Sequence, residues 1–247
     1  MCCLFLAASS TVAIAQTSVV DLVNPIIGTN GMGHTFPGAC VPFGLVQLSP
    51  DTDTIPHNVD GKYQPRSYEY CAGYQHKDSS IVGFSHTHFS GTGHSDLGDI
   101  LIMPTTGTLK LNPGTATNPD GGYRSRFSHG TEISRPGYYE VMLADYGVKA
   151  QLTTTQRVGI HKYTYPTNSE NQRIILDMIH GIYNYDGKVL WTNIRVENDT
   201  LVTGYRITNG WARTNYTYFA MSFSKPITHY GCEEKAKVNY RGGYAKF

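Results

Sequence analysis

Several common signals are missing from this chain of 247 residues. Charged residues make up only 16% of it, against roughly 25% in ordinary soluble domains, and the formal net charge is +1. Lys and Arg are scattered singly, so there is no basic stripe to neutralise the phosphates of a nucleic acid. Beyond the N-terminal segment, no run approaches the roughly 20 apolar residues that span a bilayer. We therefore expect neither a nucleic-acid partner nor a membrane span.

Familiar catalytic motifs are missing as well. The chain has no G-x-S-x-G elbow, P-loop, dinucleotide-binding fingerprint or H-E-x-x-H motif. Spacing alone does not select a pair of carboxylates for glycoside hydrolysis from Asp51, Asp53, Asp96 and Asp99. If the protein is an enzyme, its chemistry is therefore either unorthodox or located elsewhere.

Cysteine is scarce outside the N-terminus. Cys40, Cys71 and Cys232 are an odd number without metal-ligand spacing, so at most one disulfide can form. The first 15 residues are apolar and small and end on an A-x-A cleavage site, which is typical of a secretory signal, although its usual basic start is missing. We expect a signal peptide at 1–15, a mature chain at 16–247 and a secreted or periplasmic protein; the alternative is a buried N-terminal segment.

The residues that are abundant favour β structure. From Val41 onwards, short segments rich in β-branched and aromatic residues alternate with Gly, Pro, Asn and Asp, which is typical of strands and turns. In 148–155, apolar and polar residues alternate, as in a strand with one buried face. The links "ADYG", "YPTNSENQ" and "VENDT" predict hairpins. The expected strands are 41–49, 80–88, 99–104, 107–111, 122–129, 138–144, 148–155, 159–166, 173–179, 188–196, 200–207 and 216–224. This pattern predicts an all-β fold, a large antiparallel two-sheet β-sandwich.

The first 75 or so residues are irregular but contain apolar side chains such as Phe36 and Leu45, which favours a fixed binding loop over disorder. Within it, Gly38 and Gly44 allow either close approach of a ligand or tight turns. The tyrosines at 68, 70 and 74 either stack on a sugar, with Glu69 accepting hydroxyl protons, or are ordinary core aromatics.

The stretch "GFSHTHFSGTGHSDLGDI" (83–100) is rich in histidine and glycine. His86 and His88 are two apart at the end of an expected strand, so we expect their side chains to share a face, with His94 and Asp96 beyond a glycine turn. Such a set can hold a divalent metal. Alternatively, the polar side chains satisfy backbone groups around an irregular turn.

Three long strings then carry a resemblance: "VNPIIGTNGMGHTFPGACVPFGLVQLSPDT", "CAGYQHKDSSIVGFSHTHFSGTGHSDLGDILIMP" and "SRPGYYEVMLADYGVKAQLTTTQRVGIHKYTYP". They closely resemble the N-terminal domain of glycoside hydrolase family 92, calcium-dependent exo-acting α-mannosidases of bacteria. The resemblance implies a β-sandwich of the supersandwich type followed by an (α/α)₆ barrel, with the active site at their junction. It also implies that the general acid, the general base and most calcium ligands lie in the barrel. No catalytic residue and no metal ligand is then expected in this chain, which alone is expected to be inactive.

The resemblance further implies residues that border the terminal mannose of an α-mannoside: Gly38, Tyr68, Glu69, Cys71, His86 and His88. Tyr68 and Glu69 stand where the family usually has a Trp-Asp pair, after a longer insertion at 53–66. With that resemblance, the 83–100 stretch is interpreted as a pocket-shaping turn. The implied reaction is inverting hydrolysis with calcium on the sugar hydroxyls. The alternative function is a stand-alone carbohydrate-binding β-sandwich.

Overall fold

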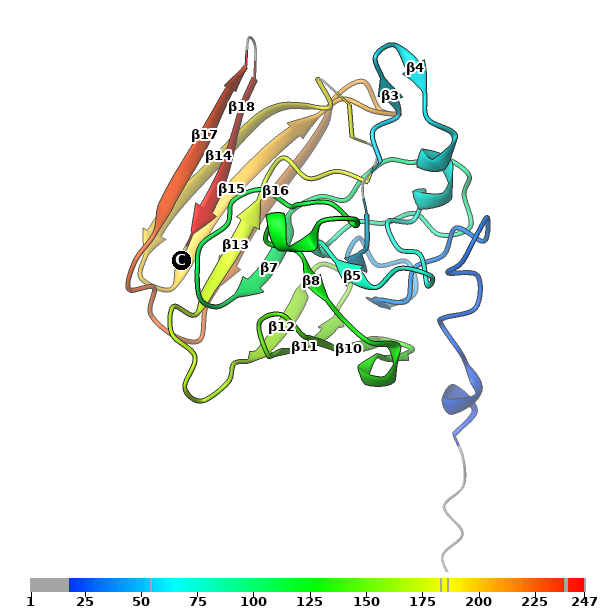
Figure 1. The fold of residues 1–247 in the computed structure, drawn as a ribbon, viewed down its shortest axis with the longest axis horizontal. Coiled ribbons are helices and arrows are strands. Elements are labelled where there is room, and N and C mark those ends of the chain that lie inside the picture. The colour runs from blue at the N-terminus through cyan, green and yellow to red at the C-terminus, as the bar shows by residue number, and fades with distance from the viewer. Residues whose placement is uncertain (1–17, 54, 183, 186, 238–239, 247) are drawn as a thin grey trace, which may run out of the picture.

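The computed structural model describes residues 18–53, 55–182, 184–185, 187–237 and 240–246. Its elements are almost entirely β-strands, with four short 3₁₀ helices in the described part (Figure 1). The strands are β1 (Ala39–Cys40), β2 (Gln47–Asp51), β3 (Asn58–Val59), β4 (Lys62–Tyr63), β5 (Ser80–Ile81), β6 (Gly83–Ser85), β7 (Leu101–Thr105), β8 (Ser125–Arg126), β9 (Ile133–Arg135), β10 (Tyr138–Leu143), β11 (Val148–Thr154), β12 (Gly159–Thr164), β13 (Arg173–Asp177), β14 (Val189–Asn198), β15 (Leu201–Thr208), β16 (Asn215–Ser222), β17 (Gly231–Lys237) and β18 (Tyr240–Lys246). The helices are η1 (Val19–Leu22), η2 (Pro65–Tyr70), η3 (Pro119–Gly121) and η4 (His129–Thr131).

A seven-stranded antiparallel sheet, ordered β1-β2-β6-β7-β13-β18-β17, forms the middle of the molecule. Every residue of β6 and β7 is buried. Continuous burial, rather than alternation, is what a strand shows when both faces of its sheet are covered.

One face of the central sheet is covered by the sheet β12-β11-β10-β9. Leu101 and Met103 of β7 share a core cluster with Val141 of β10 and Leu152 of β11. Burial alternates along β11, as the sequence predicts, because its second face meets solvent. The antiparallel sandwich is therefore confirmed.

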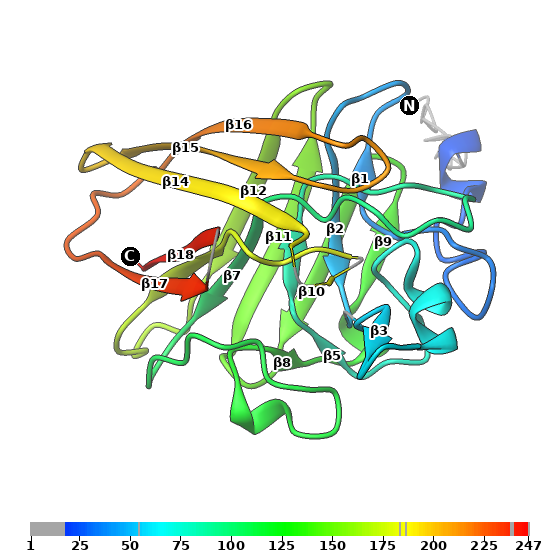
Figure 2. The same ribbon diagram turned by 90° about the horizontal axis from the view of Figure 1, so that it is seen from above.

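The other face is covered by a third sheet, β14-β15-β16. Ile102 and Leu176 of the central sheet pack with Ile194, Phe219 and Met221. Successive residues of a strand point to opposite faces, so Leu101 and Ile102 serve the two cores separately. Figure 2 shows β14, β15 and β16 running across the direction of β2, β7 and β11. The sandwich thus has an additional third layer.

Three local predictions differ from the structure. The link 165–172 does not form a hairpin, because β12 and β13 belong to different sheets. The segment 107–111 contains no strand. Leu111 packs against the core without hydrogen bonding to a neighbouring strand, so the apolar residues of this segment reflect burial and not strand pairing. The expected strand 41–49 is also interrupted, by a turn in which Gly44 N–H donates to the Val41 carbonyl at 3.0 Å.

The irregular N-terminal segments lie together at the side of the sheets, in blue and cyan at the right of Figure 1. Hydrogen bonds fix them to each other: His76 N–H donates to the Thr29 carbonyl at 2.8 Å, and the Gln75 side chain bonds both backbone groups of Gly31. They form an ordered platform of loops beside the central sheet.

Other sequence predictions have separate outcomes. The expected signal peptide at 1–15 lies outside the described residues. Cys40, Cys71 and Cys232 all remain thiols, so the one disulfide that the sequence allowed does not form. None of the helices among the described residues is long and apolar enough to cross a bilayer.

Candidate functional site

The histidine-rich loop leaves the central sheet as soon as β6 ends at Ser85. His86 donates through Nδ1 to the Ile100 carbonyl at 2.7 Å and faces His161, whereas His88 donates through Nδ1 to the Gln47 carbonyl at 2.7 Å. The expectation that the two rings share a face is wrong, because the strand periodicity on which it depends stops one residue earlier.

Under the loop, the fully buried Asp51 of β2 joins two histidines. Its oxygens lie 2.8 Å from Nε2 of His88 and 2.7 Å from Nε2 of His180, which follows β13. Burial alone would raise the pKa of the Asp51 carboxyl. The positive charge of His88 and the hydrogen bonds from His180 and His88 outweigh burial and hold that pKa below its usual range. Asp51 is thus a charged structural centre.

Two further aspartates fix the end of the same loop. Asp99 accepts from Thr87 Oγ1 at 2.6 Å and from the buried Nε of Arg206, on β15, at 2.7 Å. Asp96 pairs with Lys188 and accepts from the backbone N–H of Trp211 at 2.9 Å. Burial would raise the pKa of Asp96, but its hydrogen bond and ion pair with Lys188 lower it.

The four candidate carboxylates are therefore all engaged inside the protein. Asp53, the remaining one, lies 3.3 Å from the buried guanidinium of Arg124. A general acid or base must reach the substrate within hydrogen-bonding distance. Asp51, Asp96 and Asp99 hold the loop in place through these internal partners, and Asp53 is bonded to Arg124.

Tyr68 of η2 presents a partly exposed aromatic surface. Its side chain is 41% exposed, and the edge of His34 meets the ring at 4.8 Å with an angle of 89°. A Cβ at Gly93 would overlap the Tyr68 hydroxyl, so a larger residue there would require the Tyr68 ring to move. The contact joins η2 to the histidine-rich loop.

Next to Gly93, His94 meets the exposed ring of Trp211 edge-on, with centroids 4.4 Å apart. Both line a shallow pocket of about 400 Å³. Its lining residues are His57, Asn58, His94, Ser95, Tyr185, Gly210 and Trp211. Sequence reasoning missed Trp211, for which the only signal is the rarity of tryptophan, present twice in the chain. We call Tyr68, His94 and Trp211 the aromatic rim.

The other expected site residues lie at different depths. The Glu69 carboxylate forms an ion pair with Lys77, and its backbone carbonyl accepts from Gln75. Cys71 is buried, accepts a hydrogen bond from Ser95 Oγ at 3.1 Å, and has its thiol pKa raised by burial. Glu69 is therefore beside the rim and Cys71 is beneath it.

Gly38 and His86 are separated from the rim. Gly38 is buried against β2, where a Cβ would overlap the Leu48 carbonyl and Ser49, so its close approach is to the protein's own backbone. His86 lines a groove of about 1500 Å³ between β12 and β16, with His161 at 3.0 Å between their Nε2 atoms. Burial, the largest influence, lowers the pKa of His86 to about 4. The six expected residues do not form one patch on this chain.

Comparison with known proteins gives related sequences and structures. The family model described as the glycosyl hydrolase family 92 N-terminal domain matches residues 22–246. The family GH92 α-mannosidase BT3965 from Bacteroides thetaiotaomicron, solved alone and in complex with mannoimidazole, is 40% identical with a TM-score of 0.80. The match covers 92% of this chain and 30% of that one.

Two more distant relatives agree. The GH92 family glycosyl hydrolase ccman5 is 21% identical with a TM-score of 0.68, again over 92% of this chain and 30% of that one, and shows the shared fold. An uncharacterized secreted glycosidase of Arthroderma benhamiae is 28% identical over 170 residues, which is 65% of this chain and 19% of that protein. The chain thus spans less than a third of the length of each of these relatives.

Proposed function

This chain belongs to the glycosyl hydrolase family 92 N-terminal domain family, and from that membership we propose that it completes the substrate pocket of an α-mannosidase. The main support is the match over residues 22–246, together with 40% identity to an α-mannosidase whose structure contains mannoimidazole. The proposed substrates are glycans with terminal α-mannose, and the proposed location is outside the cytoplasm, after removal of residues 1–15.

The aromatic rim supplies the surface for the sugar in this proposal. An exposed tyrosine or tryptophan ring offers a flat apolar face to the C–H groups of a pyranose and a polar group at its edge. His34 and Gly93 hold the Tyr68 ring from two sides, so little side-chain freedom is lost when a sugar packs on it. The adjacent Glu69 carboxylate is the acceptor for a hydroxyl group.

The catalytic acid and base are placed by this proposal in a further domain, expected to be an (α/α)₆ barrel. Inverting hydrolysis needs two carboxyl groups about 6.5–9.5 Å apart, one of them protonated and both in reach of substrate. The internal pairing of Asp51, Asp96 and Asp99 supports that placement. We expect the chain alone to be inactive.

Calcium ligands are assigned to the further domain for a similar reason. Calcium takes six to eight oxygen ligands, mostly carboxylates, carbonyls and waters. Among the described residues around the rim, the buried carboxylates are already bonded to Lys188, Arg206 and two histidines. These residues do not fit a calcium site, so we assign no calcium ligand to them.

The test is hydrolysis of an aryl α-mannoside by the full-length protein with calcium present, with the product anomer followed by NMR. Release of β-mannose as first product is expected, together with no turnover by the isolated chain. Absence of hydrolysis by the full-length protein, with mannoside binding retained by the isolated chain, would favour the carbohydrate-binding alternative. Turnover by the isolated chain would contradict the assignment of the acid and base to another domain.

The location is tested separately. Mass spectrometry of the exported protein is expected to show a chain beginning at Gln16, since Ala13-Ile14-Ala15 forms the cleavage site. An intact Met1 on exported protein would contradict it.

A further inference from the structure

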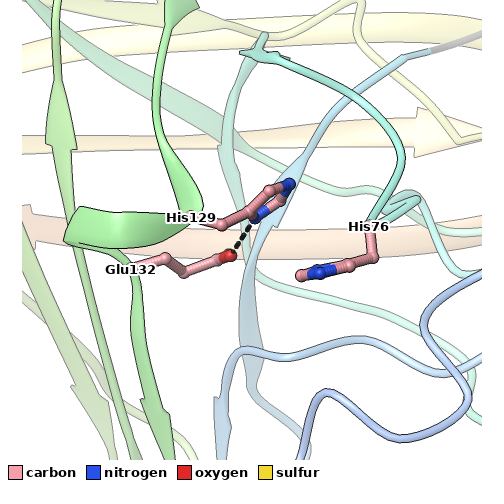
Figure 3. A group of neighbouring side chains, drawn as sticks. All are labelled: His76, His129 and Glu132. Atoms are coloured by element: carbon pink, nitrogen blue, oxygen red, sulfur yellow. Dashed lines mark hydrogen bonds and ion pairs between the residues drawn. The ribbon is translucent and has the colours of Figure 1, made fainter.

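Two histidines and a glutamate, His76, His129 and Glu132, meet outside the set of residues that forms the aromatic rim. His76 follows Gln75, His129 is in η4 and Glu132 follows η4 (Figure 3). One ligand atom from each residue lies within 4.8 Å of the others. Residues 53 positions apart are therefore brought together around one point, and the proposed mannosidase function uses none of them.

The Glu132 carboxylate is held in a fixed position. Its side chain is 3% exposed and accepts from the Tyr74 hydroxyl at 2.9 Å, the Tyr139 hydroxyl at 2.6 Å and His129 Nδ1 at 2.7 Å. No Lys or Arg of the described residues forms an ion pair with it. A buried carboxylate is costly unless a cation compensates its charge. Among the side chains that the structure describes, those in contact with this carboxylate that could carry a positive charge are imidazoles.

The two imidazoles remain reachable from solvent. The His129 side chain is 38% exposed and His76 is partly exposed. Their rings lie with centroids 3.9 Å apart and planes 33° apart, and the Tyr74 hydroxyl is 3.4 Å from His76 Nδ1. An ion has a path to the cluster, and binding it requires the rings to turn so that their in-plane lone pairs converge.

We propose that His76, His129 and Glu132 form a zinc-binding site. Zinc prefers imidazole nitrogen and carboxylate oxygen in a four-coordinate arrangement, and three protein ligands leave the fourth position to water. Calcium and magnesium prefer oxygen ligands throughout, so two imidazoles select against them. The Tyr74 and Tyr139 hydroxyls orient the carboxylate from behind, as outer-shell partners of metal ligands do.

A bound zinc ion would link the loop at 74–76 to the turn at 129–132, two segments that are otherwise joined here by the hydrogen bond from Tyr74 to Glu132 and by the ring contact of His76 with His129. Because the ligands converge only in the folded chain, binding stabilises the fold. The site is therefore a metal link within the N-terminal domain, separate from the calcium expected in the further domain.

The experiment uses the full-length protein, stripped with a chelator and returned to saturating calcium so that the calcium site is filled. Zinc chloride is titrated by calorimetry and by competition with a chromophoric chelator. We expect one zinc per chain that His76→Phe, which keeps a ring but removes the ligand, weakens by a factor of about 100 or more. Outer-shell changes cost about 10–100-fold, so Tyr139→Phe should fall in that range.

His229→Phe is the matched control, because it removes an exposed histidine far along the chain from the cluster. It should leave zinc affinity and stoichiometry unchanged. The melting temperatures of the variants without zinc must match wild type, and added zinc should stabilise wild type and the control fully, Tyr139→Phe less, and His76→Phe least. No zinc uptake by wild type at micromolar concentrations, or equal uptake by His76→Phe, would overturn the proposal. So would an equal loss in His229→Phe, which would mean binding to surface histidines in general.

Discussion

Replacing Asp51 by Asn tests whether buried charge holds the histidine-rich loop. The substitution keeps the shape of the side chain but removes the carboxylate that faces His88 at 2.8 Å and His180 at 2.7 Å. Breaking a buried ion pair from one side costs about 3–5 kcal/mol, since the remaining partner is left without compensation. For a domain of this size, each kcal/mol lowers the melting temperature by about 2–4 °C. The expected loss is about 6–20 °C.

The assay is thermal and urea unfolding at pH 7, with Asp120→Asn as the control. Asp120 makes an equally short contact, 2.7 Å to Arg126, but both side chains are exposed, and exposed pairs contribute little. The same Asp→Asn change at position 120 should therefore have no measurable effect on the melting temperature. The folded-state pKa of Asp51 is depressed, so its contribution is complete above the unfolded pKa of about 3.9 and is lost as pH falls through lower values. Equal stability of the two variants would refute the role given to Asp51.

Three further outcomes are expected. Tyr68→Ala should lower kcat/KM on an α-mannoside roughly tenfold, because about 1 kcal/mol or more of stacking is lost, with an unchanged melting temperature; a lower melting temperature with normal kinetics would instead show a purely structural ring. Gly38→Ala should destabilise the fold, as urea unfolding would show, because its Cβ overlaps the Leu48 carbonyl; wild-type stability would contradict that packing. Acidification from pH 6.5 to about 4 should lower the free energy of unfolding by up to about 3 kcal/mol, because the lowered pKa of buried His86 means that the unfolded chain binds the proton before the folded chain does. His86→Gln should flatten this part of the profile of stability against pH.

The sequence predicts best the strands in which buried and exposed residues alternate along the strand itself. In β11, each buried residue has a partly exposed neighbour, and the period of two is visible without knowing the partner strand. The order of the central sheet is different. β13 lies between β7 and β18, and nothing within 173–179 indicates either neighbour. Pairing between strands distant in sequence depends on the whole chain, which explains why the link at 165–172 is wrongly predicted as a hairpin.

The candidate site also combines features that the sequence predicts with features that only the fold reveals. Tyr68 and Glu69 are predicted as site residues from their chemistry and from the resemblance to a family, and the latter information comes from outside the physics of this chain. Trp211 is missed because its partner His94 is far away in sequence and only the fold brings them together. The histidine pair is misread because a spacing of two implies a shared face only while the strand continues, and β6 ends at Ser85.

The loop at 86–99 has few ladder hydrogen bonds, so its position depends on side chains. Each of its supporting carboxylates bonds to a side chain from a different part of the fold: Asp51 to His180 after β13, Asp96 to Lys188 before β14, and Asp99 to Arg206 of β15. Such pairs add little net stability compared with apolar packing, but breaking one costs several kcal/mol. A displacement of the loop that breaks a pair is therefore unfavourable in free energy. Because Gly93 and His94 belong to this loop, the pairs also fix where the rim meets η2 and Trp211. A binding surface held in advance loses less entropy when a sugar binds, and we infer that this is why three buried charges lie beneath an exposed aromatic rim.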